Sequence, residues 1–256
     1  MDMIFDIVSP LQLGGAIAVA MLAGLIKGLV GFAMPMILIS GMSMFVSPEI
    51  ALAGLILPTL VTNGIQALRQ GPRAAVQSVM RFRIFLCSML AMLLVSAQLV
   101  RVLPGEWLLI FIGGPISLFA ISQLAGFPLR LARGPSKLIE AGVGGFAGFI
   151  GGLSGVWGPP TVAYLTALDT EKREHVRVQG VIYGVGAVAL FAAHVGSGVL
   201  TPRTALFSLI LVPPAVAAMS LGVKVHDRID QKAFRKATLL VLLIAGLNLL
   251  RRAIFA

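Results

Sequence analysis

Long apolar runs with almost no charge inside them are the feature that most restricts what this chain can fold into. A helix needs about 20 apolar residues to cross the hydrocarbon core of a bilayer, which is about 30 Å thick. The clearest candidate spans are residues 50–68, 84–100, 107–124, 178–195, 204–221 and 237–250. Hydrophobic residues occupy 58% of the 256 positions and charged residues only 12%, about half the charged share of a soluble domain. The sequence therefore predicts an all-α polytopic membrane protein.

The ionisable residues lie at the ends of these runs and in the connections between them. Of the twenty Lys and Arg residues, only Lys27 lies well inside an apolar run, as expected if a charge in hydrocarbon is costly. The net charge of +10 follows from basic residues that flank membrane spans, so it does not indicate a nucleic-acid partner. Cys87 is the only cysteine, which excludes a disulfide within the chain. His175 and His226 are expected in polar connections, without the spacing of metal ligands.

Two further apolar stretches, residues 11–46 and 138–168, are too long for one span and are interrupted by glycine and proline. The interrupting glycines of the first stretch recur 127 residues later in the second: Gly24, Gly28 and Gly31 become Gly151, Gly155 and Gly158. Each interruption is followed by proline, an apolar piece of about ten residues, a polar connection and three full spans. We therefore predict two homologous halves, residues 1–129 and 138–256, joined by a basic cytoplasmic linker at residues 130–137.

The basic residues also predict how the two halves insert into the membrane. Fifteen of the twenty lie in four connections, at residues 69–83, 130–137, 172–177 and 224–236, which the positive-inside rule places in the cytoplasm. The first broken segment then starts and ends on the outer side, and the second starts and ends on the inner side. We predict two inverted-topology repeats, each a broken or re-entrant helical hairpin followed by three transmembrane helices, with the N-terminus outside.

Inverted repeats with one broken helix each are typical of secondary transporters, which bind their substrates near the bilayer midplane. The N-terminus of a half-helix bears about half a positive charge and attracts anions. Lys27 adds a full charge at the first interruption, although its side chain could instead reach to the cytoplasmic face. No carboxylate lies inside a span, so a cationic substrate would have no counter-charge. The residues therefore favour a small anion as the substrate.

The remaining candidates for the substrate site are the residues of the two interruptions and polar residues at span depth. Each has a structural alternative, because amides bond helices together, glycines allow close packing, and an arginine can simply flank a span. The predicted substrate-binding set is Lys27, Gly28, Gly31, Asn63, Gln66, Ser154, Gly155, Trp157, Gly158, Pro159, Arg177, Gln179 and Tyr183. We predict no catalytic residue, no metal site and no cofactor.

The segments Gly-Leu-Ile-Lys-Gly-Leu-Val-Gly-Phe-Ala-Met-Pro, ending at Pro35, and Gly-Gly-Leu-Ser-Gly-Val-Trp-Gly-Pro-Pro, ending at Pro160, resemble those of the TauE/SafE family. This family is also called the sulfite exporter or toluene-sulfonate uptake permease family. The resemblance implies a permease of a bacterial-type cytoplasmic membrane for sulfite, sulfoacetate or other sulfonates, with export favoured. It also implicates the matching positions Gly28, Gly31, Gly155, Gly158, Pro160 and Arg177. The first half departs from the family pattern at residues 32–34, Phe-Ala-Met, where more glycine is expected.

The resulting hypothesis is a permease, not an enzyme, that works by alternating access with a midplane anion site at the two broken helices. An anion channel on the same scaffold is the first alternative, and a non-transporting partner subunit is another. A membrane-embedded enzyme is less favoured, because no His, Asp and Glu cluster or Ser-His pair lies at one depth. The expected partners are the small anion and the lipid bilayer, without nucleic acid, and a homodimer is left open as the assembly state.

Overall fold

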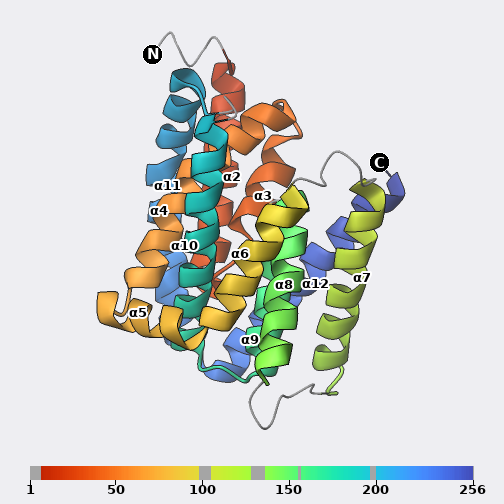
Figure 1. Ribbon diagram of the computed structural model, residues 1–256. Coiled ribbons are helices and arrows are strands. Elements are labelled where there is room, and N and C mark those ends of the chain that lie inside the picture. The colour runs from red at the N-terminus through yellow and green to blue at the C-terminus, as the bar shows by residue number, and fades with distance from the viewer. Residues whose placement is uncertain (1–6, 98–104, 128–135, 155–156, 197–199, 256) are drawn as a thin grey trace. The chain divides into compact units, whose positions relative to one another are not determined.

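The computed structural model describes residues 7–97, 105–127, 136–154, 157–196 and 200–255, and within these residues the chain is helical, with no strand. The predicted all-α class is therefore confirmed. The helices are α2 (Pro10–Val30), α3 (Met34–Met42), α4 (Pro48–Leu68), α5 (Pro72–Arg81), α6 (Arg83–Ala97), α7 (Gly105–Leu124), α8 (Lys137–Ser154), α9 (Gly158–Ala167), α10 (Lys172–Gly196), α11 (Pro202–Arg228) and α12 (Gln231–Phe255) (Figure 1).

Four helices among the described residues are long and apolar enough to cross a membrane. They are Pro10–Val30, Ile50–Leu68, Pro202–Arg228 and Gln231–Ile254. The pair Pro72–Arg81 and Arg83–Ser96 gives a fifth span if it is counted as one, although its two helices meet at a bend of 73°. The predicted polytopic membrane class is thus confirmed. The connection expected at residues 69–83 differs from the prediction, because α5 occupies most of it.

The starts of the long helices follow from the residues that precede them. Ser9 caps α2 and Thr201 caps α11, each with a side chain that accepts a hydrogen bond from the backbone three residues later. Both caps are followed by proline, which suits the first helical position because its missing N–H would have no helical partner. These local signals place the helix starts independently of tertiary contacts.

Gly24 and Gly28 do not interrupt the first helix, contrary to the expectation from sequence. Helix α2 continues through both residues to Val30. The reason is packing against α11, because a Cβ atom added at Gly28 would lie 2.2 Å from the carbonyl oxygen of Met219. These glycines serve close approach between two helices, and a role for Gly28 in substrate binding stays a prediction. Gly151 likewise lies inside α8, which continues to Ser154.

The true break in the first half consists of residues 31–33, between α2 and α3. Gly31 ends α2 in the left-handed conformation, with φ of 88°, which glycine adopts without steric cost. Ala33 begins α3 with φ of 73°, a conformation that costs an L-residue with a Cβ atom roughly 1–2 kcal/mol. The position where the sequence led us to expect glycine therefore has a glycine-like backbone despite its alanine.

The described contacts divide the chain into two compact units. Unit 1 contains Met1–Pro72 and Gly180–Ile229, and unit 2 contains Arg73–Gln179 and Asp230–Ala256. Each unit takes helices from both predicted halves, and helix α10 contributes residues to both units. This division describes which helices pack together and does not test repetition in the sequence. The halves 1–129 and 138–256 therefore stay a prediction.

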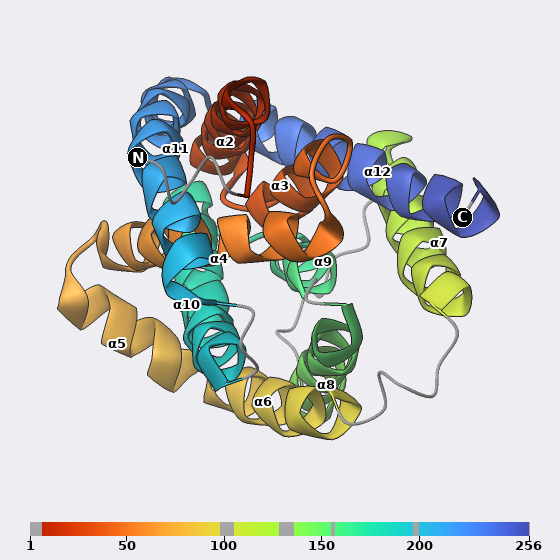
Figure 2. The ribbon, with the colours of Figure 1, turned by 90° about the horizontal axis from the view of Figure 1, so that it is seen from above.

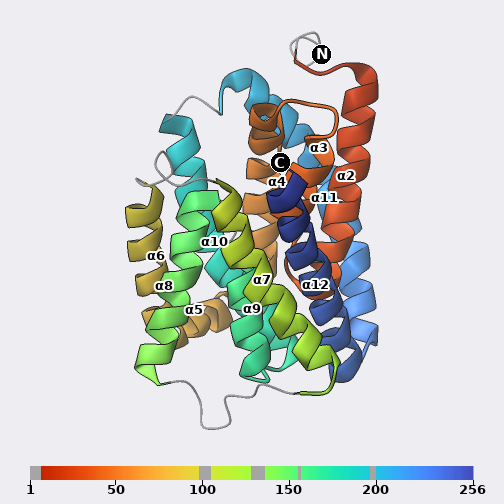
Figure 3. The ribbon, with the colours of Figure 1, turned by 90° about the vertical axis from the view of Figure 1, so that its right-hand side faces the viewer.

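Glycines allow close helix approach in both units. In unit 1, α2 lies beside α11 (Figure 2), and a Cβ atom at Gly24 would lie 2.2 Å from the carbonyl oxygen of Ala215. In unit 2, α8 lies beside α6 (Figure 3), and a Cβ atom at Gly148 would lie 2.0 Å from the carbonyl oxygen of Met89. Small residues let helix backbones meet where lipid provides no hydrophobic drive for association.

The helices of the two halves follow the same order. A long helix is followed by a short helix and a second long helix, as α2, α3 and α4 in the first half and as α8, α9 and α10 in the second. The short helices have 9 and 10 residues, close to the length expected from sequence. The opposite insertion of the two halves stays a prediction.

Thiol accessibility tests that insertion. We expect Ser47→Cys and Glu171→Cys, each in a Cys87→Ser background, to react with a membrane-impermeant maleimide from opposite sides of the membrane. Both positions are exposed, so a difference in labelling reports sidedness and not burial. Labelling of intact and of inside-out vesicles gives the two sides separately. Reaction of both residues from the same side would contradict the inverted repeat.

Candidate functional site

Lys27 lies in the last turn of α2 and is only 1% exposed. Its Nζ atom donates a hydrogen bond to Asn63 Oδ1 of α4 and lies 5.9 Å from the centre of the Tyr183 ring of α10. All three residues belong to unit 1. Among the described residues, no carboxylate forms an ion pair with Lys27. The partial negative charge at the end of α2 favours a cation at this position without neutralising it.

Helix α4 presents three neighbouring polar side chains to the break of the first half. Thr62 Oγ1 lies 3.2 Å from the Met34 sulfur at the start of α3. Asn63 bonds to Lys27, and Gln66 Nε2 donates a hydrogen bond of 3.0 Å to the Gly31 carbonyl. Residues at these spacings share one face of a helix. The same face of α4 therefore contacts Lys27 and both ends of the break.

The second part of α10 adds Tyr183 to Lys27, Gly31, Asn63 and Gln66, and these five residues are called the Lys27 cluster. Helix α10 reaches α4 because Gly180 permits close approach: a Cβ atom there would lie 2.5 Å from the backbone nitrogen of Ala67. Tyr183 is buried, with 5% of its surface exposed. A tyrosine ring attracts a cation through its face, so Tyr183 stabilises the lysine without providing an anionic partner. Lys27, Gly31, Asn63, Gln66 and Tyr183, five of the predicted site residues, are thus brought together.

Asn63 provides a buried hydrogen-bond donor that has no acceptor among the described residues. Within the described residues, the Asn63 Nδ2 atom is buried and has no hydrogen-bond partner. Leaving a buried polar group unsatisfied costs roughly 1–3 kcal/mol. The Lys27 ammonium can donate three hydrogen bonds, and one of them goes to Asn63 Oδ1. A small ligand rich in acceptor oxygens would satisfy both side chains at once.

The predicted site residues of the second interruption belong to unit 2. Ser154 is the last residue of α8, and Gly155 lies outside the described residues. Trp157 is 5% exposed and packs against α8, while Gly158 and the buried Pro159 begin α9. Their contribution to substrate binding stays a prediction.

Arg177 and Gln179 lie in the first turns of α10, also in unit 2. Arg177 Nε donates a hydrogen bond of 2.9 Å to Ser78 Oγ of α5, and its Nη2 atom lies 3.7 Å from Glu174. These contacts provide a structural role for Arg177 at the start of the helix. Gln179 is completely buried. A role for either residue in substrate binding stays a prediction.

His226 is buried, although the sequence predicts it in a polar connection. Helix α11 continues to Arg228, and His226 is 0% exposed. Its Nδ1 atom lies 3.1 Å from the Leu29 carbonyl oxygen of α2, two residues after Lys27. His175 is likewise helical and 2% exposed. Both histidines have Lys and Arg neighbours in sequence, which is typical of a polar connection. Burial of a side chain against another helix leaves no local signal in the sequence.

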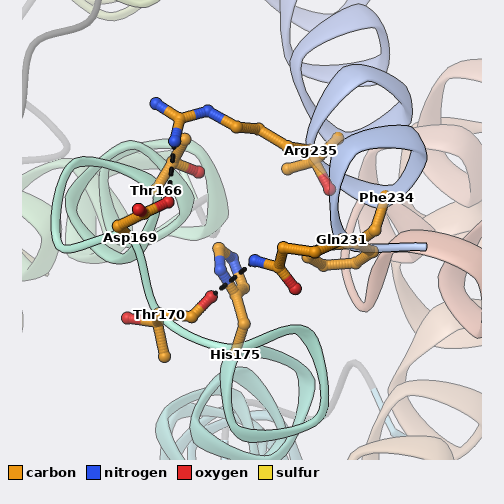
Figure 4. A pocket seen from close by; sticks show the side chains of 8 residues that line it. Thr166, Asp169, Thr170, His175, Gln231, Phe234 and Arg235 are labelled. Atoms are coloured by element: carbon orange, nitrogen blue, oxygen red, sulfur yellow. Dashed lines mark hydrogen bonds and ion pairs between the residues drawn. The ribbon is translucent and has the colours of Figure 1, made fainter.

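Unit 2 contains a small cavity lined mainly by polar side chains. It lies between the end of α9, the start of α10 and the start of α12 (Figure 4), and its volume is about 10 Å³. Arg235 Nη1 contacts Asp169 at 2.8 Å, and Gln231 Nε2 donates to the Thr170 carbonyl at 3.1 Å. A single water needs about 10–15 Å³ of such volume, so the cavity is about the size of one water molecule. These contacts tie α12 to the connection between α9 and α10.

Comparison with known families agrees with the resemblance seen in sequence. The family whose description is Sulfite exporter TauE/SafE matches residues 16–249, nearly the whole chain. Comparison with curated proteins and with solved structures gave no significant match. The match covers both broken segments and the residues around Lys27. The chain therefore belongs to the TauE/SafE family, whose members are membrane permeases for sulfur-containing anions.

Proposed function

We propose that this protein is a carrier for a small sulfur oxyanion, of the sulfite or sulfonate type, and that Lys27 and Asn63 bind the anion. The observation that supports this role is the buried Lys27 ammonium, which has an amide and an aromatic ring as partners and no carboxylate among the described residues. A cation at membrane depth is costly unless it is neutralised. The oxyanion would provide that neutralisation when it is bound.

The surroundings of Lys27 also suggest how binding proceeds. Asn63 Oδ1 accepts a hydrogen bond from the ammonium, while Asn63 Nδ2 is a donor without an acceptor among the described residues. An arriving oxyanion accepts hydrogen bonds from both side chains, and such charge-assisted bonds are stronger than neutral ones. The N-terminus of α3 begins at the break and adds a partial positive charge.

The burial of Lys27 favours a carrier over a channel. A channel requires a continuous path that its ions enter and leave, whereas the Lys27 side chain is 1% exposed. In an alternating-access cycle, the anion site opens to one side of the membrane at a time. We propose this cycle in a bacterial-type cytoplasmic membrane, with net export as the favoured direction and without catalysis.

Reconstituted transport tests the proposal. Purified protein in liposomes should take up labelled sulfite, sulfoacetate or a related sulfonate with saturable kinetics. Unlabelled substrate inside the vesicles should accelerate uptake, because a carrier reorients faster when loaded. Acetate and choline serve as matched probes of anion chemistry and of charge sign, and an imposed pH gradient reports proton coupling. Flux that never saturates and shows no counterflow would instead indicate a channel. Transport of choline alone would contradict the anion assignment.

A further inference from the structure

A surface groove in unit 2 lies between α6 and α8, and none of its lining residues belongs to the Lys27 cluster. Its volume is about 440 Å³, and it is lined by Arg83, Ile84, Cys87, Ser88 and Ala141. Ser88 Oγ donates its hydrogen bond to the Phe85 carbonyl of its own helix. The groove therefore offers an apolar wall along most of its length and one guanidinium. This combination suits an amphiphile with an apolar tail and an acceptor-rich head.

The bend between α5 and α6 indicates the depth at which this guanidinium lies. Helix α6 is apolar, and α5 leaves it at 73°. Helix α5 is amphipathic, with the exposed apolar residues Val76 and Met80 and the exposed basic residues Arg73 and Arg81. Such a helix lies in the plane of the membrane interface. Arg83 directly follows the bend, so it is expected at the level of the lipid headgroups.

The charged side chains at the end of the groove formed by the starts of α6 and α8 are mainly basic. Among the described residues, Arg83 is exposed and forms no ion pair. Lys137 is also exposed and begins α8, one turn before Ala141 on the same helix face. Glu140 is the acidic residue nearby, and its carboxylate accepts a hydrogen bond of 3.2 Å from the Phe85 backbone nitrogen. Two basic side chains are thus free to meet an anionic group.

We propose that the groove between α6 and α8 binds one anionic phospholipid. The acyl chain lies along Ile84, Cys87 and Ala141, and the headgroup phosphate bonds to Arg83 with Lys137 beside it. An arginine matches the geometry of phosphate oxygens, and basic pockets between transmembrane helices bind anionic headgroups. The net negative charge of the headgroup distinguishes this ligand from zwitterionic lipid. The site does not depend on the transported substrate.

Cys87 provides a direct test, because the only cysteine of the chain lines the groove and is exposed. A bound lipid should shield its thiol. In a neutral detergent, added phosphatidylglycerol should slow labelling of Cys87 by N-ethylmaleimide at lower concentration than phosphatidylcholine with the same acyl chains. Arg83→Gln and Lys137→Gln should each raise the half-protecting concentration of phosphatidylglycerol about fivefold, the effect of one basic residue at an anionic surface. Native mass spectrometry should show one retained phosphatidylglycerol, lost from the Arg83→Gln variant.

The control is Arg203→Gln, which removes an exposed arginine of unit 1 and should leave both readouts unchanged. Equal protection by the two lipids would overturn the proposal, because it would indicate acyl-chain binding without headgroup recognition. Undiminished protection in both the Arg83→Gln and Lys137→Gln variants would overturn it as well. Neither readout measures transport, so failure here is distinguishable from failure of the proposed carrier function.

Discussion

Lys27→Met is expected to raise the KM for the transported oxyanion by about tenfold to a hundredfold or to abolish transport. A hydrogen bond to a charged group contributes about 1.5–3 kcal/mol, and each 1.4 kcal/mol changes affinity about tenfold. The variant should still fold, because methionine fills a similar volume and removes a charge that is costly to bury. Uptake of labelled sulfite or sulfonate into liposomes, over a range of substrate concentrations, measures the effect.

Two variants distinguish loss of charge from loss of shape at this position. Lys27→Arg should keep part of the affinity, because it retains the cation but changes its geometry. Lys224→Met removes an exposed lysine of α11 in the same unit and should transport as the wild type does. A Lys27→Met protein with unchanged KM would place the anion site elsewhere.

Asn63→Asp tests the same site by adding a negative charge beside Lys27, whereas Lys27→Met removes the positive charge. The new carboxylate would lie against the Lys27 ammonium, where Asn63 Oδ1 accepts the hydrogen bond. An internal ion pair of this kind would neutralise the cation and compete with the substrate. We expect transport to fall as strongly as in Lys27→Met while the protein remains folded. Full activity in Asn63→Asp would contradict the proposal that an external anion neutralises Lys27.

The second large effect is expected at Gly222, where α11 meets α2. A Cβ atom there would lie 2.2 Å from the Leu25 carbonyl oxygen and 2.9 Å from the Gly28 Cα atom. Both neighbours are backbone atoms, so relief requires the two helices to separate. We expect Gly222→Val to lower the free energy of unfolding by at least about 1–3 kcal/mol, the usual cost of overpacking. A lower Tm and loss of the monodisperse peak in size-exclusion chromatography would report it.

Gly14→Ala is the matched control, since it lies on α2 and a Cβ atom there would have nothing within 4 Å. It should leave the Tm unchanged or raise it, because alanine favours helix more than glycine does. If Gly222→Val were as stable as this control, the close packing of α2 and α11 would not support the fold.

The membrane class, the spans at residues 50–68, 204–221 and 237–250, and the existence of a break followed by a short helix were predictable from sequence. These features depend on local properties: the free energy of moving apolar residues into hydrocarbon, and the backbone preferences of glycine and proline. The break at Gly31 was predicted in the right region, with Lys27 just before it. The prediction that Gly24 and Gly28 interrupt the helix was wrong. They are glycines like Gly31, but they lie inside a continuous helix.

From the sequence alone, Lys27 is predicted well inside an apolar run and no carboxylate inside any span, which favours an anionic substrate. The three-dimensional fold was needed to show that Asn63 and Tyr183 contact Lys27, that Gln66 bonds to the break, and that His226 is buried against α2. These contacts join residues 35 to 197 positions apart in the chain. Hydropathy and local backbone preference report where a helix runs, whereas the partner of each face depends on which helices pack together.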